Sequence, residues 1–356
     1  MKFKIKTVDF LSALKKSGKC AGNKFDPIGN YIALSVVDNI LTTTITNRIT
    51  ALNTITKVDG DNFYACLPYD KLNKLVSKIS SEYISFSLVG TNVKIKADGT
   101  YTLAALVNSV GEIAEIKDFY RETMKADYTT TISYNQIADI ISMGKGSLHK
   151  GKEYTCCYEN YYIDDTCAMT TDSIVATYFS ICDIFPTPIL LSPTLVDIFK
   201  DMEGAISIEY NDKQLKAYND DTQVISQLPN GLKDYRVSVI KDLTQKEYEG
   251  TIQVYRDALL SAAERLSIFV NEVADKFTIR LEFDENKITL STLSGDTETI
   301  NGDGANCNGT CNVNINCFVD ALKSMKGDVI DVSFGKLMPI RLFNREAVYK
   351  IIAPKA

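Results

Sequence analysis

The sequence has very few of the residues from which catalytic sites are usually built. Its 356 residues include a single histidine, His149, so any Ser-His-Asp or Cys-His mechanism would have to use that side chain. His149 lies in SMGKGSLHKGKEY, whose glycines and lysines are typical of a mobile surface loop. The sequence also lacks the phosphate loop GxxxxGK[ST], the dinucleotide loop GxGxxG, and the HExxH and GxSxG motifs. We therefore expect no enzyme and no catalytic residue.

Long apolar runs are missing as well. No run approaches the ~18–20 residues that a membrane span needs. The first residues, MKFKIKTVDF, alternate between polar and apolar instead of forming an apolar block, so we expect no secretory signal. The nine cysteines are an odd number in a long chain. This favours a reduced, cytoplasmic protein with free thiols.

Three of the cysteines cluster in NGDGANCNGTCNVNINC, namely Cys307, Cys311 and Cys317. A structural zinc site usually needs four ligands, and neither a fourth cysteine nor His149 lies nearby in the sequence. We therefore expect no metal and no other cofactor. The segment is better interpreted as a polar hairpin loop followed by a strand.

Composition favours a globular protein, with 45% hydrophobic and 24% charged residues. Its length suits two or three domains. The 39 basic and 45 acidic residues give a net charge of −6. Taken alone, this acidity argues against a nucleic-acid binder, whose footprint is usually basic.

Six segments of the sequence resemble one another, and each has the apolar periodicity of a short amphipathic helix. They span residues 8–18, 69–80, 134–146, 192–204, 255–267 and 316–327. The fourth residues of these segments are separated by 61, 65, 58, 63 and 61 positions, a regularity that indicates an internal repeat. Side-chain oxygens that suit helix starts come from Asp9, Asp70, Asn135 and Ser192.

Each predicted helix follows a short β-like run and precedes further alternating segments. Asp98-Gly99 and Asn219-Asp220 lie at or near the expected hairpin turns. A single unit of about sixty residues buries too little apolar area to be stable alone, so we expect the six units to pair. The predicted fold class is α+β, with three similar domains at 1–126, 127–244 and 245–356. Each would pack two helices on antiparallel sheets.

Several segments, in order along the whole chain, resemble one known family. They are MKFKIKTVDFLSALKK at the start, DPIGNYIALSV (26–36), LTTTITNRITA (41–51), MTTDSIVA (169–176), LPNGLKDYRVSVI (228–240), DENKITL (284–290) and IIAPKA at the end. The most specific of these is 228–240. Together with the repeat, they resemble the bacterial DNA polymerase sliding clamp, the beta subunit of DNA polymerase III.

The resemblance implies a non-enzymatic processivity factor. Two subunits would join head to tail into a homodimeric ring, with helices lining the hole and sheets outside. The ring would encircle duplex DNA without sequence specificity and tether the replicative DNA polymerase, after a clamp loader has placed it there. A divergent, phage-encoded clamp would fit the low similarity.

The charge distribution agrees in sign with such a ring. The six helical segments carry 11 basic and nine acidic residues, a net charge of +2, which leaves −8 for the rest of the chain. The residues expected to face DNA are Lys15, Lys19, Lys24, Lys71, Lys74, Lys78, Lys145, Lys150, Tyr154, Lys200, Arg265 and Lys323. Tyr154 would either stack on an exposed base or pack under a loop.

The resemblance also implies a hydrophobic groove that binds a short peptide of the polymerase or loader. Carried over by position, its residues are Cys156, Thr171, Ser173, Val175, Val237, Ser238, Phe277, Asn314, Leu337, Pro339, Ile351 and Pro354. The family's Gly-His-Arg is Ser173-Ile174-Val175 here, and its second Arg after Tyr is Val237. We therefore expect a groove that has lost positive charge and prefers a different peptide motif.

Two alternatives from other classes stay open on these residues, and one of them is an enzyme whose site has no recognisable motif. The other is a structural or assembly protein of a phage, built as a ring from the same repeated α+β module, which would share the repeat and the acidity. It would not need a positive layer around its hole.

Overall fold

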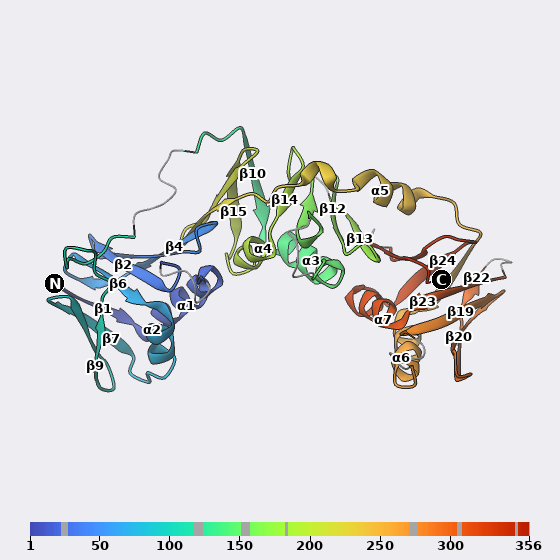
Figure 1. Cartoon of the computed structure of the whole chain (residues 1–356), viewed down its shortest axis with the longest axis horizontal. Helices are drawn as coiled ribbons and strands as arrows, with labels where there is room; N and C mark the ends of the chain where they lie inside the picture. Colours follow the sequence, from blue (N-terminus) through green and yellow to red (C-terminus); the bar gives the residue numbers. More distant parts are fainter. Residues whose placement is uncertain are drawn as a thin grey trace. The chain divides into compact units, whose positions relative to one another are not determined.

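The computed structural model describes residues 1–22, 28–116, 124–150, 157–181, 184–270, 276–304, 308–345 and 348–355. Its internal contacts divide the chain into two compact units. Unit 1 comprises Met1–Ile137 and Thr194–Leu228, and unit 2 comprises Ala138–Pro193 and Pro229–Ala356. Figure 1 shows the elements of both units.

Unit 1 contains two antiparallel sheets. The five-stranded sheet has the order β5-β1-β7-β8-β9, with β5 (Asp59–Gly60), β1 (Lys2–Lys6), β7 (Tyr83–Val89), β8 (Asn92–Lys96) and β9 (Thr100–Ala104). The eight-stranded sheet has the order β10-β15-β16-β17-β4-β3-β2-β6. Its strands are β10 (Tyr128–Ser133), β15 (Ala205–Tyr210), β16 (Gln214–Tyr218), β17 (Thr222–Gln227), β4 (Thr50–Lys57), β3 (Ile40–Thr46), β2 (Tyr31–Val37) and β6 (Phe63–Pro68).

The helices of unit 1 are α1 (Thr7–Ser17), α2 (Tyr69–Val76) and α4 (Pro193–Phe199). Helix α1 packs against α2 and against β4. Phe10 of α1 meets Phe86 of β7 edge to face at 5.2 Å between ring centroids, and Phe86 stacks on Phe3 of β1 at 4.7 Å. All three side chains are buried, so helix and sheet share one apolar core.

Unit 2 also contains two antiparallel sheets. The nine-stranded sheet has the order β14-β11-β12-β13-β26-β25-β24-β18-β22. Its strands are β14 (Ile189–Leu191), β11 (Tyr161–Ile163), β12 (Cys167–Thr171), β13 (Val175–Ser180), β26 (Val348–Ile352), β25 (Ile340–Phe343), β24 (Val329–Phe334), β18 (Gly250–Tyr255) and β22 (Asp303–Gly304). The four-stranded sheet β21-β20-β19-β23 comprises β21 (Thr297–Asn301), β20 (Lys287–Thr292), β19 (Thr278–Asp284) and β23 (Gly309–Asn314).

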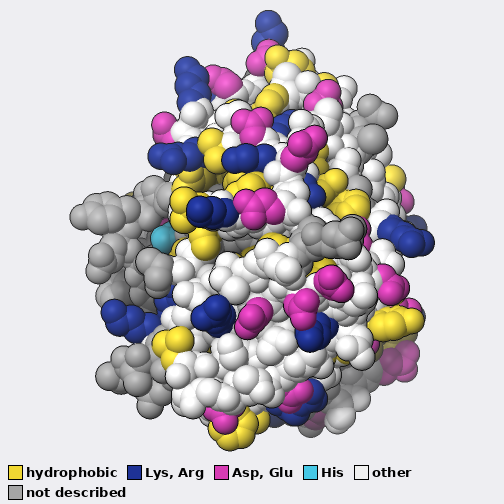
Figure 2. All heavy atoms as spheres, turned by 90° about the vertical axis from the view of Figure 1, so that its right-hand side faces the viewer, with side chains coloured by type: hydrophobic (Ala, Val, Ile, Leu, Met, Phe, Trp, Pro, Cys, Tyr) yellow, Lys and Arg dark blue, Asp and Glu magenta, His cyan; other side chains and the backbone are white. Residues whose placement is uncertain are grey.

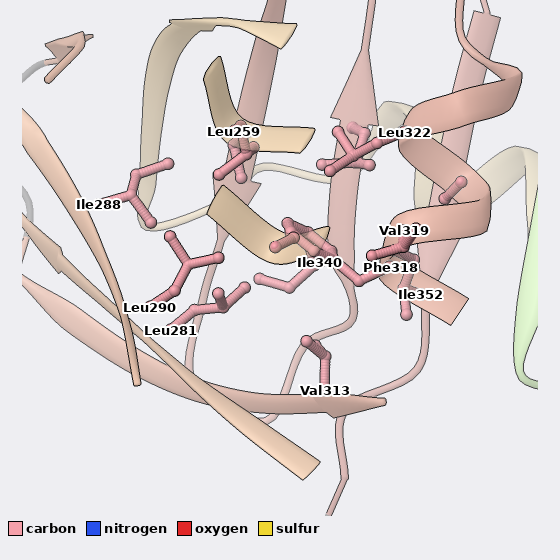
Figure 3. Close-up of a cluster of buried hydrophobic side chains, with 14 of the residues drawn as sticks. Leu259, Leu281, Ile288, Leu290, Val313, Phe318, Val319, Leu322, Ile340 and Ile352 are labelled. Atoms are coloured by element: carbon pink, nitrogen blue, oxygen red, sulfur yellow. The ribbon is translucent and has the colours of Figure 1, made fainter. Parts of the chain in front are cut away.

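The helices of unit 2 are α3 (Tyr134–Gly144, which begins at the unit boundary), α5 (Val237–Gln245), α6 (Arg256–Ser267) and α7 (Ile315–Ser324). Helix α6 packs against α7. Figure 3 shows their apolar side chains, Leu259 and Leu322 among them, pointing towards Leu281, Leu290 and other residues of the strands. A second buried cluster gathers Tyr162, Met169 and Tyr235 with Ile240 of α5.

The predicted α+β fold class is confirmed. All six predicted helices form within a few residues of their expected ranges, although α2 and α4 end earlier, at Val76 and Phe199. The six β-like runs before them are β1, β6, β10, β14, β18 and β23. Sequence reasoning missed α5. The two hairpin turns are also confirmed, between β8 and β9 and between β16 and β17.

Helix capping differs from the prediction. Helices α1 and α2 have no side-chain cap. At α3 the cap comes from Ser133 and not from Asn135: the Gln136 N–H donates to Ser133 Oγ, and Gln136 Oε1 accepts from the Ser133 N–H, as in a capping box. At α7, Asn314 Oδ1 accepts from two backbone N–H groups.

Strand exchange joins the repeats in pairs. In unit 1, β1 precedes α1 but pairs with β7, which follows α2, while β6 precedes α2 and pairs with β2, which follows α1. In unit 2, β18 and β24, and β23 and β19, make the same exchange around α6 and α7. The three-domain division stays a prediction. Sheets run across its predicted boundaries through the pairs β17–β4 and β13–β26.

Candidate nucleic-acid and partner-binding surfaces

Helix α2 carries the clearest positive stripe among the described helices. Leu72 and Val76 bury its apolar side, which leaves Lys71 and Lys74, and Lys78 just beyond its end, exposed. These lysines lie three and four residues apart, on one face. Lys15 of the neighbouring α1 is also exposed. None of the four forms an ion pair with a described residue, so their charges are available to a ligand.

Two further basic residues at the end of α1 are already paired within unit 1. The Lys16 ammonium lies 2.8 Å from an Asp221 carboxylate oxygen and also donates to Thr222 Oγ1. The Lys19 ammonium pairs with Asp201 and donates to the Asp197 carbonyl oxygen. These contacts hold α1 to the end of α4 and to the β16–β17 turn. Lys19 is therefore a structural contact as well as a predicted DNA-facing residue.

A cavity of about 730 Å³ lies in unit 1 beside these lysines. Its lining includes Lys15, Lys16 and Lys200, but also Asp201 and Glu203. Lys200 is exposed and has no ion pair among the described residues. The mixture of charges gives the cavity little net attraction for an anion.

The predicted DNA-facing cations of α6 and α7 are paired with carboxylates. The Arg265 guanidinium binds Glu298 through two hydrogen bonds of 2.7 and 2.9 Å, and this bond lowers the pKa of the Glu298 carboxyl. The Lys323 ammonium lies 2.8 Å from Glu264. Lys145 and Lys150 are exposed and form no ion pair with a described residue. Two predicted DNA-facing residues, Lys24 and Tyr154, lie outside the described residues, as does Cys156 of the predicted groove.

The described part of the segment around His149, residues 142–150, is packed more closely than expected. Its first residues belong to α3, and Lys145–Ser147 form a 3₁₀ turn. Ser147 and Leu148 are buried. Ser147 Oγ lies 2.6 Å from Thr177 Oγ1, which also accepts a hydrogen bond from the fully buried ammonium of Lys350. The segment 144–150 is therefore partly packed and is not a free surface loop.

A groove-like cavity of about 440 Å³ lies in unit 2. Its walls come from the β12–β13 turn, helix α5 and the last residues of the chain. Six of the predicted groove residues line it: Thr171, Ser173, Val175, Pro339, Ile351 and Pro354. Exposed apolar atoms lie at its rim, since Ile174 is 51% exposed and Val239 is 49% exposed. The geometry suits the apolar side chains of an extended segment.

Five other predicted groove residues lie elsewhere. Val237 packs against the buried cluster beneath the cavity, and Ser238 is exposed on α5. Phe277 packs against the core of α6 and α7, and Asn314 caps α7. Leu337 is 93% exposed in a turn but does not line the cavity.

Sequence reasoning missed eight lining residues: Tyr158, Ile174, Ala176, Arg236, Val239, Ile240, Leu243 and Ala353. The spacing of Val239, Ile240 and Leu243 is that of a helix face and would have identified α5. The expected loss of positive charge from the groove stays a prediction. Val237 does not line the cavity, whereas the exposed Arg236 next to it does.

The β12–β13 turn has a well-defined geometry. Asp172 Oδ1 accepts hydrogen bonds from the backbone N–H groups of Ile174 and Val175, at 2.9 and 2.7 Å. Ser173 adopts a left-handed conformation with φ 75°, which is uncommon outside glycine. The Ala353 N–H donates to the Ile174 carbonyl oxygen at 2.8 Å. The turn and the chain end are thus held together at the mouth of the cavity.

Neither a metal centre nor a membrane-spanning helix is present among the described residues. No three of their His, Cys, Asp or Glu side chains are grouped as metal ligands. Burial raises the pKa of the Cys311 thiol to about 12, which disfavours the thiolate that binds zinc. Cys307 of the same cluster lies outside the described residues. No described helix has the length and apolarity to cross a bilayer.

Comparison with known proteins gave structural matches but no sequence-family match. No model of a protein family matches the chain, and no curated protein does. The DNA polymerase sliding clamp from Bacillus subtilis superposes with a TM-score of 0.86 at 16% identity, covering 100% of this chain and 99% of that one. DNA polymerase III subunit beta from Borrelia burgdorferi gives a TM-score of 0.85 at 15% identity, with 100% and 98% covered. The subunit from Pseudomonas aeruginosa gives 0.85 at 14% identity, with both chains fully covered. The chain therefore has, over its whole length, the fold of bacterial DNA polymerase III beta sliding clamps.

Proposed function

We propose that this protein is a DNA sliding clamp that encircles duplex DNA and tethers a replicative polymerase. The observation that carries the proposal is the full-length superposition on three clamp subunits. The exposed, unpaired lysines of α1 and α2 agree with it, because they supply a weak, sequence-independent contact to phosphate. A ring acts by topology: it keeps the polymerase near the primer end and raises its effective concentration there.

A head-to-tail homodimer would close the ring. Within the chain, sheets are continued by the pairs β17–β4 and β13–β26. In the six-fold repeat, β4, β13 and β21 are the last strands longer than two residues in the first, third and fifth units. The last strands of the second, fourth and sixth units are β9, β17 and β26. Each of β21 and β9 ends its sheet in the described structure. Pairing β21 of one copy with β9 of another would continue the same pattern and cover two edge strands.

The cavity of unit 2 is the proposed docking site for the polymerase and the clamp loader. Its apolar walls would bind hydrophobic side chains of an extended peptide, and Arg236 would attract an acidic neighbour in that peptide. This function needs no catalytic residue and no cofactor. It places the protein in the cytoplasm, where replication takes place. The alternative, a phage assembly ring, is not favoured, because the whole chain superposes on clamp subunits.

Retention on DNA tests the proposal. The protein, loaded on a nicked circular plasmid, should elute with the DNA in gel filtration and be lost after the plasmid is cut once. Its solution mass should be twice the chain mass of 39.5 kDa. Equal retention on circular and linear DNA would contradict the clamp proposal, as would a monomeric protein that never binds circles.

A further inference from the structure

The outer face of the five-stranded sheet in unit 1 carries an unusual array of lysines. Alternation along β1 buries Phe3 and Ile5 and exposes Lys2, Lys4 and Lys6. Alternation along β8 buries Val93 and Ile95 and exposes Lys94 and Lys96. We call these five residues the outer lysine array.

The register of the sheet places the array on one face in two rows. Lys2 pairs with Ser87 of β7, which pairs with Lys94 of β8. Lys4 pairs with Ser85, which pairs with Lys96. Directly paired residues point to the same side of a sheet. Lysines along one strand are therefore about 6.6–6.8 Å apart, and the two rows are about 9.5 Å apart.

No lysine of the array forms an ion pair with a described residue, although Asp59 of β5 lies directly opposite Lys4. Strands β1, β7, β8 and β9 contain no acidic residue. Carboxylates lie only at the border. Asp59 of β5 is paired with Lys4 and shares its face, and Asp61 just beyond β5 accepts a hydrogen bond from the Lys2 backbone N–H. Asp98 is in the β8–β9 turn, where Ser80 and Ser81 donate hydrogen bonds to it.

The β7 residues between the two lysine rows are two serines and a tyrosine. Ser85 and Ser87 offer hydroxyl groups, and Tyr83 lies beneath the Lys4 ammonium, 4.1 Å from its ring centroid. The chain as a whole has a net charge of −6. Five lysines without an ion pair on one sheet face therefore contrast with the acidic balance of the whole chain.

We propose that the outer lysine array binds the backbone of single-stranded nucleic acid. Lysines supply positive charge, and serine hydroxyls supply hydrogen bonds to phosphate oxygens. The lysine spacing is of the same order as that between neighbouring phosphates. A flexible single strand can follow the face of a sheet across both lysine rows, whereas a stiff duplex contacts it along one line.

An acidic peptide is less suitable, because an extended peptide pairs with a sheet edge and the array lies on the face. This site is distinct from the helices and groove described above, and it does not depend on the clamp proposal.

The test measures binding of a fluorescent single-stranded DNA 12-mer by anisotropy over a range of salt concentrations. The variant K4Q/K94Q/K96Q changes only exposed side chains. Its matched control is R280Q/K287Q, on the outer face of the four-stranded sheet. A second control, K71Q/K74Q/K78Q, reports binding through α2. Thermal unfolding confirms that all variants are folded, and parallel samples contain the duplex of the same sequence or vesicles with anionic lipid.

We expect the triple variant of the array to bind the single strand at least tenfold more weakly at low salt. The slope of log affinity against log salt should fall by about 2, at about 0.7 for each lost contact. R280Q/K287Q should bind as the wild type does. Unchanged binding by K4Q/K94Q/K96Q would overturn the proposal, as would equal dependence on the array for duplex DNA, or array-dependent binding to vesicles alone. Retention on circular plasmid reports the clamp function separately, and we expect K4Q/K94Q/K96Q to keep it.

Discussion

The two sheets at β1 and at β19 have the same construction but very different outer faces. Both belong to a pair of exchanged repeats, and both bury an aromatic and aliphatic inner face against two helices. The outer face of the β1 sheet has five lysines on β1 and β8, and the one acidic residue in its strands is Asp59 of β5. That of the β19 sheet has Arg280 and Lys287 beside Glu282 and Asp284. Figure 2, which shows the side of the molecule that bears β19 and β20, displays blue and magenta side chains interspersed.

The helices packed on these two sheets also differ in charge, and those of unit 1 are the more basic. Helices α1 and α2 carry four lysines and two aspartates, whereas α6 and α7 carry three basic and three acidic residues. Arg265 and Lys323 are occupied by carboxylates, but Lys15, Lys71 and Lys74 are not. The buried side chains of each repeat determine the fold. The solvent-exposed side chains are therefore free to differ in charge, and so in what they bind.

The largest expected effect is a loss of stability on truncating a buried aromatic ring, and it should be equal in unit 1 and unit 2. Phe10→Ala in unit 1 and Phe318→Ala in unit 2 each remove a fully buried ring, and each should lower the free energy of unfolding by roughly 3–5 kcal/mol. Urea denaturation measures this. Phe269, which is 59% exposed, is the matched control, since its replacement by alanine should change stability by less than about 0.5 kcal/mol. A large effect at only one buried ring would show that the two cores are not equivalent.

Much of this equivalence could be predicted from the sequence. Apolar spacing of three and four located all six repeated helices, because a buried helix face leaves a local periodic signal. The α3 cap was misassigned because Ser133, Asn135 and neighbouring polar residues all suit a cap, and only backbone geometry selects one. The partners of Arg265 and Lys323 could not be predicted, because Glu298 and Glu264 approach them only after strand and helix pairing. The lysine alternation in β1 and β8 was visible, but the register that joins the two rows was not.

A buried cation of unit 2 should respond to pH. The Lys350 ammonium is fully buried and donates to the Met143 carbonyl oxygen and to Thr177 Oγ1. Burial lowers the pKa of Lys350 to about 7, from an ordinary value of 10.5. Between these values the unfolded chain binds more protons than the folded one, so this group makes stability rise as pH rises from 7 towards 10.

The variant Lys350→Met should remove that contribution. Its free energy of unfolding, measured in urea between pH 7 and 9, should rise less with pH than that of the wild type. Lys323→Met, at an exposed and paired lysine, is the control and should keep the wild-type slope. Identical slopes for Lys350→Met and wild type would contradict a strongly depressed pKa.

The groove of unit 2 allows a test of binding that leaves the lysines untouched. Val239→Glu places a charge at an apolar, half-exposed wall of the cavity, and should weaken binding of the cognate polymerase about tenfold or more. Surface plasmon resonance measures this. Val8→Glu makes the same change on exposed α1 and should have no effect on polymerase binding. Equal losses in both variants would place the docking site elsewhere.

A smaller effect should follow from releasing the paired cations of unit 2. Glu264→Gln combined with Glu298→Gln frees Lys323 and Arg265. Exposed ion pairs contribute only about 0.2–1 kcal/mol each, so stability should change little. The variant should dissociate more slowly from circular DNA at low salt, because two cations become available to phosphate. Unchanged dissociation would mean that α6 and α7 do not face the DNA.

The most direct test of the difference between the two regions is a lysine-acetylation footprint of the whole chain, read by mass spectrometry. On nicked circular DNA, Lys71, Lys74 and Lys78 should be protected, while the paired Lys323 should react as it does in the free protein. Adding a single-stranded oligonucleotide should protect Lys2, Lys4, Lys94 and Lys96 as well. Equal protection of the α2 and α7 lysines, or no protection of the outer lysine array, would contradict the account.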